Sequence, residues 1–275
     1  MARFLDSGTG APTLLFVHGY GCAKEDWDAQ ISALCDEFRC IALDLPGHGK
    51  ADTPATASVT VLAEAVNEVR GLSQDEVILI GHSLGTKVIR EACTVAPQNL
   101  SGLIFIDGLL YEKDTDQIQA GIRIYIETNG FDAFVRDYFS AVSDDPGARR
   151  THDFLIARAR GLAPDFGRDI YCAAVGFDKT RGETTLASIR VPVLVLQSSR
   201  IDAAGWRVPL RVGETTPLME RVRRLVARHE IVTVTGSSHF PMLGKPDLVA
   251  GEIRRFARSV AGGTFVPGAR AACYI

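Results

Sequence analysis

Short unbroken runs of apolar residues recur along the chain, and longer stretches with apolar residues at helical spacing lie between them. Unbroken apolar runs are typical of parallel strands buried on both faces. Six runs predict strands: Thr13–Val17, Arg39–Leu43, Val77–Ile80, Leu103–Ile106, Val193–Leu196 and Ile231–Val234. Five stretches predict helices: Glu25–Cys35, Val59–Val69, Leu84–Val95, Leu218–Arg228 and Leu248–Phe256. This alternation predicts an α/β fold with a mostly parallel central sheet flanked by helices.

The alternation stops over residues 111–188, where the pattern is helical and no strand is predicted. We therefore expect an α/β core made of residues 1–110 and 189–260, interrupted by a helical insertion at 111–188. A second long connection, Arg200–Pro217, contains several Gly and Pro residues and is predicted to be a loop. Loops of that length in compact domains tend to be functional. The Gly-rich segment 261–275 is expected to be a mobile tail.

Composition narrows the class of protein. The chain has 275 residues, of which 46% are hydrophobic and 23% charged, so a large core is available and disorder is excluded. The net charge of −3 gives no indication of a nucleic-acid partner or an anionic membrane surface. We find no apolar run long enough to span a membrane and no secretory signal, and expect a cytoplasmic protein. No Cys/His cluster has metal-ligand spacing.

The most specific motif is Gly81-His82-Ser83-Leu84-Gly85, which matches G-x-S-x-G between a predicted strand and a predicted helix. A serine on such a tight turn adopts a strained backbone that projects its hydroxyl above the sheet edge. The flanking glycines are needed because side chains there would collide where strand and helix approach. The following helix N-terminus favours negative charge. Ser83 is therefore a candidate nucleophile.

A second motif, His18-Gly19-Tyr20-Gly21, follows the first predicted buried strand. A Gly-rich turn at a strand end can expose backbone N–H groups to a developing oxyanion. We predict that the backbone N–H groups of Tyr20 and Leu84 form an oxyanion hole. His18 is predicted to support this turn from a buried position.

Five stretches together resemble the α/β-hydrolase superfamily. They are HGYG at 18–21, DLPGHG at 44–49, GHSLG at 81–85, VPVLVLQS at 191–198 and GSSHFPMLGKP at 236–246. They follow the family's order from about residue 12 to residue 259. The resemblance implies an eight-stranded sheet, a cap formed by the insertion, and a triad in the order Ser, acid, His. Only 17 residues precede His18, so the first one or two family strands are expected to be reduced or missing.

The resemblance assigns the nucleophile to Ser83 and the general base to His239. It places the acid after the strand in VPVLVLQSSRID, which nominates Asp202. Ser198 stands where the family has Gly, and Asp202 comes slightly late. Asp107, at the end of the preceding strand, is the alternative because some relatives use that position. Glu214 and Glu220 are remoter candidates.

The predicted walls of the substrate pocket adjoin this chemistry or lie in its loops; they are Tyr20, Leu84, Trp206 and Phe240, together with Gly19 and His82. A serine nucleophile predicts a covalent acyl-enzyme that water then hydrolyses. We expect a carboxylesterase for small-to-medium apolar or aromatic esters, with no cofactor and no metal. The alternatives are a lactonase, a C–C bond hydrolase, and a ligand-sensing protein on the same fold with little turnover. An exposed cap face would offer a surface for a homodimer.

Overall fold

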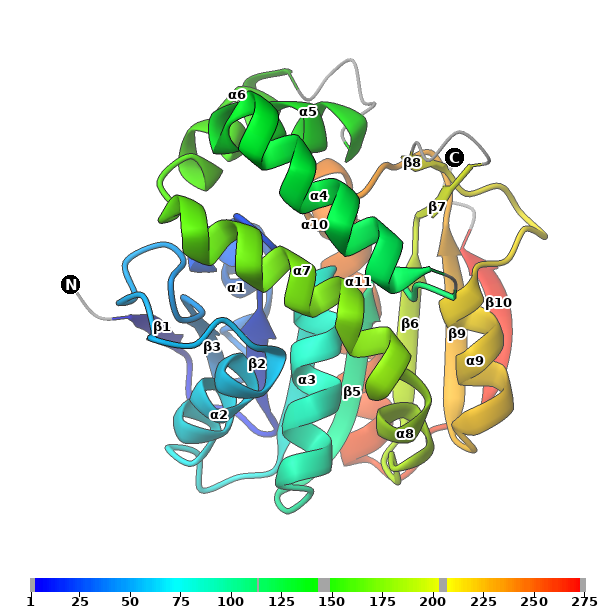
Figure 1. The fold of residues 1–275 in the computed structure, drawn as a ribbon. Coiled ribbons are helices and arrows are strands. Elements are labelled where there is room, and N and C mark those ends of the chain that lie inside the picture. Colours follow the sequence, from blue (N-terminus) through cyan, green and yellow to red (C-terminus); the bar gives the residue numbers. More distant parts are fainter. Residues whose placement is uncertain (1–2, 113, 143–148, 203–206, 273–275) are drawn as a thin grey trace.

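The computed structural model describes residues 3–112, 114–142, 149–202 and 207–272. An eight-stranded sheet forms its centre, in the order β1-β3-β2-β4-β5-β6-β9-β10 (Figure 1). The strands are β1 (Phe4–Ser7), β2 (Thr13–Val17), β3 (Cys40–Leu43), β4 (Val77–His82), β5 (Leu100–Ile106), β6 (Val193–Gln197), β9 (His229–Val234) and β10 (Gly268–Ala272). All six predicted strands are present, and the α/β-hydrolase architecture is confirmed.

The two ends of the sheet lie outside the predicted strands. β1 pairs antiparallel with β3, so the short N-terminal segment still contributes one edge strand. At the other edge β10 pairs parallel with β9. This pairing corrects the expectation of a mobile tail at 261–275, because residues 268–272 extend the sheet. Every other pairing in the sheet is parallel.

Helices cover both faces of the sheet (Figure 1). On one face lie α2 (Val59–Arg70), α3 (Leu84–Val95), α8 (Gly182–Ala187) and α9 (Pro217–Leu225), which contact one another in turn. On the other lie α1 (Asp28–Leu34), preceded by the 3₁₀ turn η1 (Lys24–Trp27), and α11 (Pro246–Ala261), preceded by the short α10 (Pro241–Gly244). The Ser58 hydroxyl caps α2 by accepting the N–H of Val61 at 3.1 Å.

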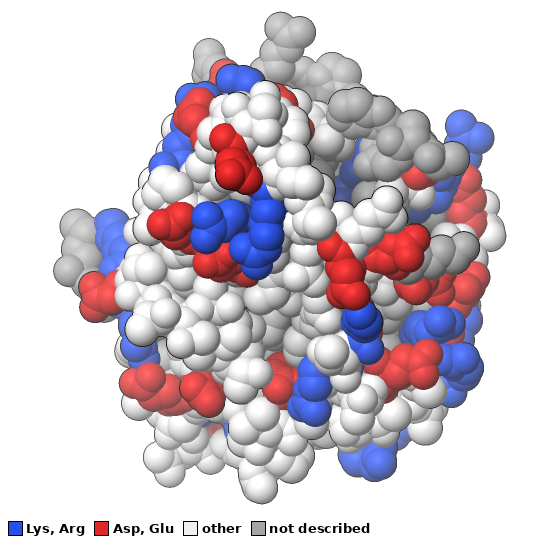
Figure 2. Space-filling view, viewed as in Figure 1, with Lys and Arg blue, Asp and Glu red and all other residues white. Residues whose placement is uncertain are grey.

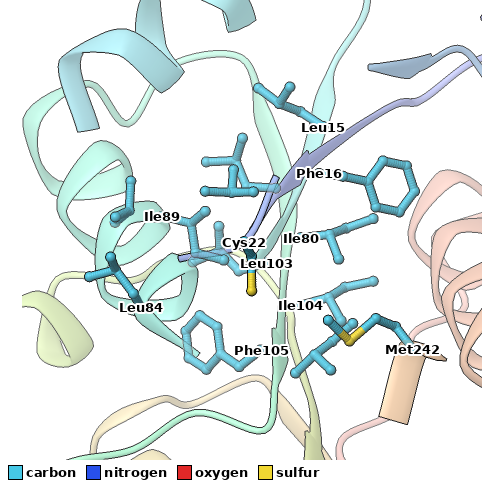
Figure 3. Close-up of a cluster of buried hydrophobic side chains, with 14 of the residues drawn as sticks. Leu15, Phe16, Cys22, Ile80, Leu84, Ile89, Leu103, Ile104, Phe105 and Met242 are labelled. Atoms are coloured by element: carbon cyan, nitrogen blue, oxygen red, sulfur yellow. The ribbon is translucent and has the colours of Figure 1, made fainter. Parts of the chain in front are cut away.

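The core consists of side chains from alternate strand positions packed under the two helix layers. Figure 3 shows Phe105 on the same side of the sheet as Leu84 and Ile89 of α3, and Ile104 on the side of Met242 of α10. These side chains are buried. Neighbouring residues of β5 therefore serve opposite helix layers, which explains the unbroken apolar run.

The described residues of 111–188 fold mainly as helices inserted between β5 and β6. They form α4 (Thr115–Asn129), α5 (Phe131–Val142), α6 (Arg149–Ala159), α7 (Pro164–Thr180) and α8. Helices α4, α5, α6 and the start of α7 lie above the carboxyl ends of the strands, and the end of α7 descends beside α3 (Figure 1). α8 instead packs beside α3 and α9 of the core. Most of the insertion thus covers one edge of the sheet, and its last helix joins the core.

Candidate active site

Ser83 lies on the sharp turn between β4 and α3. Its backbone has φ 51° and ψ −115°, a strained conformation for a residue with a side chain. A Cβ at Gly81 would lie 2.4 Å from the Gly85 carbonyl oxygen, and one at Gly85 would lie 2.3 Å from the Val17 carbonyl oxygen. Both glycines are therefore required by close backbone approach. The turn lifts the Ser83 hydroxyl above the edge of the sheet.

The loop after β9 brings His239 to this hydroxyl. His239 Nε2 lies 2.9 Å from Ser83 Oγ, and His239 Nδ1 lies 2.7 Å from Asp107 Oδ2. Because a carboxylate only accepts, Nδ1 carries the proton and donates it to Asp107. Nε2 is then free to accept the serine proton. Ser83, His239 and Asp107 form a continuous hydrogen-bonded chain, and both His239 and Asp107 are buried.

The structure corrects the prediction that Asp202 is the acid beside His239. After β6 the chain turns directly into a two-stranded hairpin, β7 (Ser199–Ile201) and β8 (Arg207–Pro209), which carries Asp202 to a half-buried position away from His239 Nδ1. Asp107 follows β5, the strand next to β4. Adjacent parallel strands end side by side, so Asp107 and Ser83 meet at the same edge.

The Asp107 carboxylate accepts hydrogen bonds on both oxygens. Oδ1 receives the Gln197 amide at 3.0 Å and the backbone N–H groups of Ser198 and Ser199 at 2.9 and 2.7 Å. Oδ2 receives His239, the Ser199 hydroxyl at 2.6 Å and Arg207 Nη1 at 2.7 Å. Burial opposes ionisation, but the Arg207 charge and the donated hydrogen bonds hold the pKa of Asp107 well below its usual range. Asp107 is therefore a fixed, ionised acceptor.

The same surroundings keep His239 neutral. Burial and the nearby Arg207 charge outweigh the attraction of Asp107 and lower the pKa of His239 to about 4. A neutral imidazole can accept a proton from Ser83 Oγ and later return it to a leaving group. The arrangement can therefore support nucleophilic attack by Ser83 across the neutral pH range.

His82 and Phe240, both predicted pocket walls, instead support His239. His82 Nε2 donates to the His239 carbonyl oxygen at 2.8 Å, and the two imidazole rings lie 4.7 Å apart. The Phe240 ring packs 5.0 Å from His239 and 5.1 Å from His82. Neither His82 nor Phe240 is among the described residues that line the cavity, so their predicted contact with substrate is corrected.

Gly19 is not among the described lining residues either, and a Cβ there would lie 2.9 Å from His82 Nδ1 and 3.1 Å from Ser83 Cβ. The close approach explains the glycine, and it holds the predicted oxyanion turn against Ser83. Tyr20 and Leu84 do line the cavity, as predicted. Trp206, a further predicted wall, falls outside the described residues.

His18 fixes this turn as predicted. Its Nε2 accepts the backbone N–H of Leu45 at 3.0 Å, and its Nδ1 lies 2.8 Å from the Gly19 carbonyl oxygen. Complete burial lowers the pKa of His18 well below its usual value, so the ring stays neutral and keeps both bonds. One of the two predicted oxyanion donors, Tyr20, is the third residue of the turn that His18 holds. The other, Leu84, is the first residue of α3, where the backbone N–H has no partner within the helix.

Ser83 opens into a cavity of about 990 Å³ between the core and the inserted helices. Its wall comes from the turn after β2 that is predicted to form the oxyanion hole, from α3, from the loop after β5, from the insertion and from the β7–β8 hairpin. The lining residues include Tyr20, Ser83, Leu84, Lys87, Tyr111, Glu112, Tyr138, Tyr171, Arg200, Asp202 and Arg207. Within the described parts of the chain no cluster of His, Cys, Asp or Glu has metal-site geometry. Among the helices described, none has the length and apolarity to cross a membrane.

A sequence model of the alpha/beta hydrolase family matches residues 14–252, more than half of the chain. The chain belongs to the alpha/beta hydrolase family. The solved structure of a thermophilic esterase from Thermogutta terrifontis superimposes on this hydrolase with a TM-score of 0.71 and 25% identity. That alignment covers 94% of this chain and 93% of the esterase.

Two curated relatives show how far the sequence similarity extends. A putative carbamate hydrolase of Agrobacterium fabrum is 25% identical over 257 residues, which cover 90% of this chain and 93% of the relative. A pimeloyl-[acyl-carrier protein] methyl ester esterase of Edwardsiella ictaluri is 35% identical over 101 residues, 36% of this chain and 37% of the relative. Several strong curated matches are partial in this way, and the chain spans between 28% and 41% of their lengths.

Sequence reasoning missed three contributors to the site. Lys87 is one turn along the helix that Ser83 begins, so the motif itself could have indicated it. Arg207 lies inside the long connection predicted to be functional, but nothing in its sequence context pairs it with Asp107. Tyr111 is the first residue of the predicted insertion, and nothing in the sequence indicated that it lies in the wall of the cavity at Ser83.

Proposed function

We propose that this hydrolase cleaves carboxylic esters of small-to-medium substrates through an acyl-enzyme on Ser83. The observation that carries the proposal is the hydrogen-bonded chain from Ser83 Oγ through His239 to Asp107, open to a cavity large enough for such an ester. The esterase and carbamate hydrolase names of its relatives point to acyl transfer as well.

Each residue of the site has its own role in this reaction. His239 takes the Ser83 proton as Oγ attacks the carbonyl carbon, and the backbone N–H groups of Tyr20 and Leu84 stabilise the oxyanion. His239 then protonates the departing alkoxide, which leaves an acyl group on Ser83. Water attacks that ester with His239 again as base, and the acid is released. Asp107 keeps the His239 ring in place throughout.

The test uses initial rates on p-nitrophenyl esters from acetate to decanoate. Ser83→Ala and Asp107→Asn are each expected to lower kcat by about 10⁴-fold or more, because the first removes the nucleophile and the second disturbs the His239 tautomer. Asp202→Asn is the matched comparison; because His239 Nδ1 pairs with Asp107, the loss of kcat should be far smaller than in Asp107→Asn, although Asp202 lines the cavity. Sustained turnover by Ser83→Ala would overturn the assignment of Ser83 as the nucleophile. One burst per molecule in the wild type would favour a ligand sensor.

A further inference from the structure

The cavity wall carries a buried cation close to Ser83. Lys87 lies four residues further along, about 6 Å along the axis of α3. It lines the cavity and is only 3% exposed. Its ammonium donates to the Leu109 carbonyl oxygen at 2.9 Å and forms an ion pair with Asp178 of α7. An ammonium has three donors, so one is left without a hydrogen bond among these contacts; the Tyr111 ring centre lies 5.4 Å from Nζ.

The Asp178 carboxylate does not balance the charge around it. Arg90, one further turn along α3, also contacts Asp178, at 3.2 Å, and is completely buried. Two buried cations therefore share this carboxylate. The buried Glu91 carboxylate also attracts Arg90, but it is already paired with Arg181 at 2.9 Å, so three cations face two carboxylates. Nε and Nη1 of Arg90 have no hydrogen-bond partner within the described structure. Burial lowers the pKa of Lys87 to about 8, and the Arg90 charge adds to this effect while Asp178 opposes it.

Most other charges near the cavity are paired, and Asp202, a further carboxylate of its wall, follows β7 rather than lying on α3 or α7. Arg207 and Asp107 neutralise each other, and His239 is neutral. On the outer wall Glu112 pairs with Arg221 at 3.2 Å, and Arg200 pairs with Glu214 at 3.1 Å. On the face of the molecule seen in Figure 2, basic and acidic side chains are interspersed. The positive excess at Lys87 and Arg90 is thus a property of the interior.

We propose that the substrate carries a carboxylate on its acyl chain and that Lys87 binds this group, an inference that rests on the proposed esterase function. A buried charge that lacks a counter-charge is costly. An anion that enters the cavity at Lys87 supplies that counter-charge, so its binding is favoured. Because Ser83 and Lys87 line the same cavity about one helical turn apart, an acyl chain that ends in a carboxylate can place its scissile carbonyl at Ser83 and its carboxylate at Lys87. The hydrolase then acts on half-esters of dicarboxylic acids.

The experiment compares two esters of the same shape and different charge. 4-Nitrophenyl hydrogen glutarate ends in a carboxylate, and 4-nitrophenyl 5-methylhexanoate ends in two methyl groups in the same place. The ratio of their kcat/KM values does not depend on the fraction of folded enzyme. We expect the wild type to favour the glutarate, and Lys87→Met to lower the ratio by about tenfold or more. Lys87→Arg should keep the preference.

Lys179→Met is the matched control. Lys179 lies on α7 and pairs with Asp116 on the surface, so its loss changes the net charge equally and should leave the ratio unchanged. If Lys87→Met lowered kcat/KM equally for both esters, the proposal would be overturned. Lys87 would then serve only as a structural contact between α3 and α7. Lack of a glutarate preference in the wild type would overturn it too.

A binding measurement separates this proposal from the esterase proposal. Calorimetry on Ser83→Ala with monomethyl glutarate needs no turnover, and we expect binding that the added Lys87→Met change abolishes. If neither nitrophenyl ester is hydrolysed, the esterase proposal fails while this binding still decides the role of Lys87. Equal binding by both variants would overturn the carboxylate site.

Discussion

Arg207 places a full positive charge beside Asp107, the carboxylate that orients the proposed base His239. Its Nη1 lies 2.7 Å from Asp107 Oδ2, and both side chains are almost fully buried. In a medium of low dielectric such a charge acts strongly on its neighbours. It offsets the negative charge that would otherwise make His239 more basic. The guanidinium thus fixes Asp107 and weakens His239 as a base at the same time.

Removing this charge should move the acid limb of the pH–rate profile. Neutral His239 is the active form, so activity falls as the pH drops through its pKa of about 4. Arg207→Gln removes a charge that lowers this pKa, and the midpoint of the acid limb of kcat/KM should shift to higher pH. Arg211→Gln, an exposed change nearby, is the control and should leave the midpoint in place. An unmoved limb in Arg207→Gln would show that Arg207 acts only on structure.

At the scale of elements, the junction of β2, β4 and α3 depends on backbones that approach more closely than side chains permit. Gly85 is the tightest point, because it faces the carbonyl oxygens of Val17 and His18, residues that lead into the oxyanion turn. A change there affects the packing of α3 and the position of the turn together. Packing and the proposed catalysis therefore share one contact.

Gly85→Ala should lower the free energy of unfolding by about 1–3 kcal/mol, since its Cβ would lie 2.3 Å from backbone oxygen. It should also reduce kcat in the molecules that remain folded. Gly121→Ala, on the exposed face of α4 with nothing within 4 Å, should instead raise the unfolding free energy by about 0.5–1 kcal/mol. Urea denaturation of both variants checks the two signs, and a neutral Gly85→Ala would contradict the packing argument.

Elements buried on both faces could be predicted from the sequence, because unbroken apolar runs carry a strong signal. β2 begins and ends where its run predicts, and so does α3. β1, with partly exposed residues, and the three-residue strands of the β7–β8 hairpin carry little pattern. The hairpin also explains the error at the acid. Asp202 is the first carboxylate after β6 along the chain, but chain order does not reveal that the strand end turns away into a hairpin.

At the scale of the molecule, the sheet is closed at one edge by the C-terminal segment. Phe265 is 9% exposed and packs edge-to-face on Phe256 of α11 at 5.6 Å, and the Arg228 guanidinium lies 5.7 Å from its ring centre. These contacts hold the chain where it enters β10. The next residue, Val266, is 76% exposed.

Phe265→Ala should therefore lower the free energy of unfolding by about 3 kcal/mol, the usual cost of removing a buried aromatic ring. Val266→Ala, one residue away but exposed, should change it by less than about 0.5 kcal/mol. Amide hydrogen exchange should show faster exchange in β10 for Phe265→Ala before the rest of the sheet is affected. Equal stability of the two variants would mean that the segment is held by other contacts.

The place of α8 sets the limits within which the inserted helices could be exchanged for those of another hydrolase. β5 ends at the covered edge of the sheet, and β6, its parallel neighbour, starts at the opposite edge. The chain must return along the whole strand length, which takes a dozen or more residues in a parallel crossover. The end of α7 and α8, packed beside α3, make this return. A chimera that takes α4, α5, α6 and the start of α7 from a donor keeps the return path, whereas one that replaces all of 111–188 with a short linker leaves β6 without a connection that can reach it.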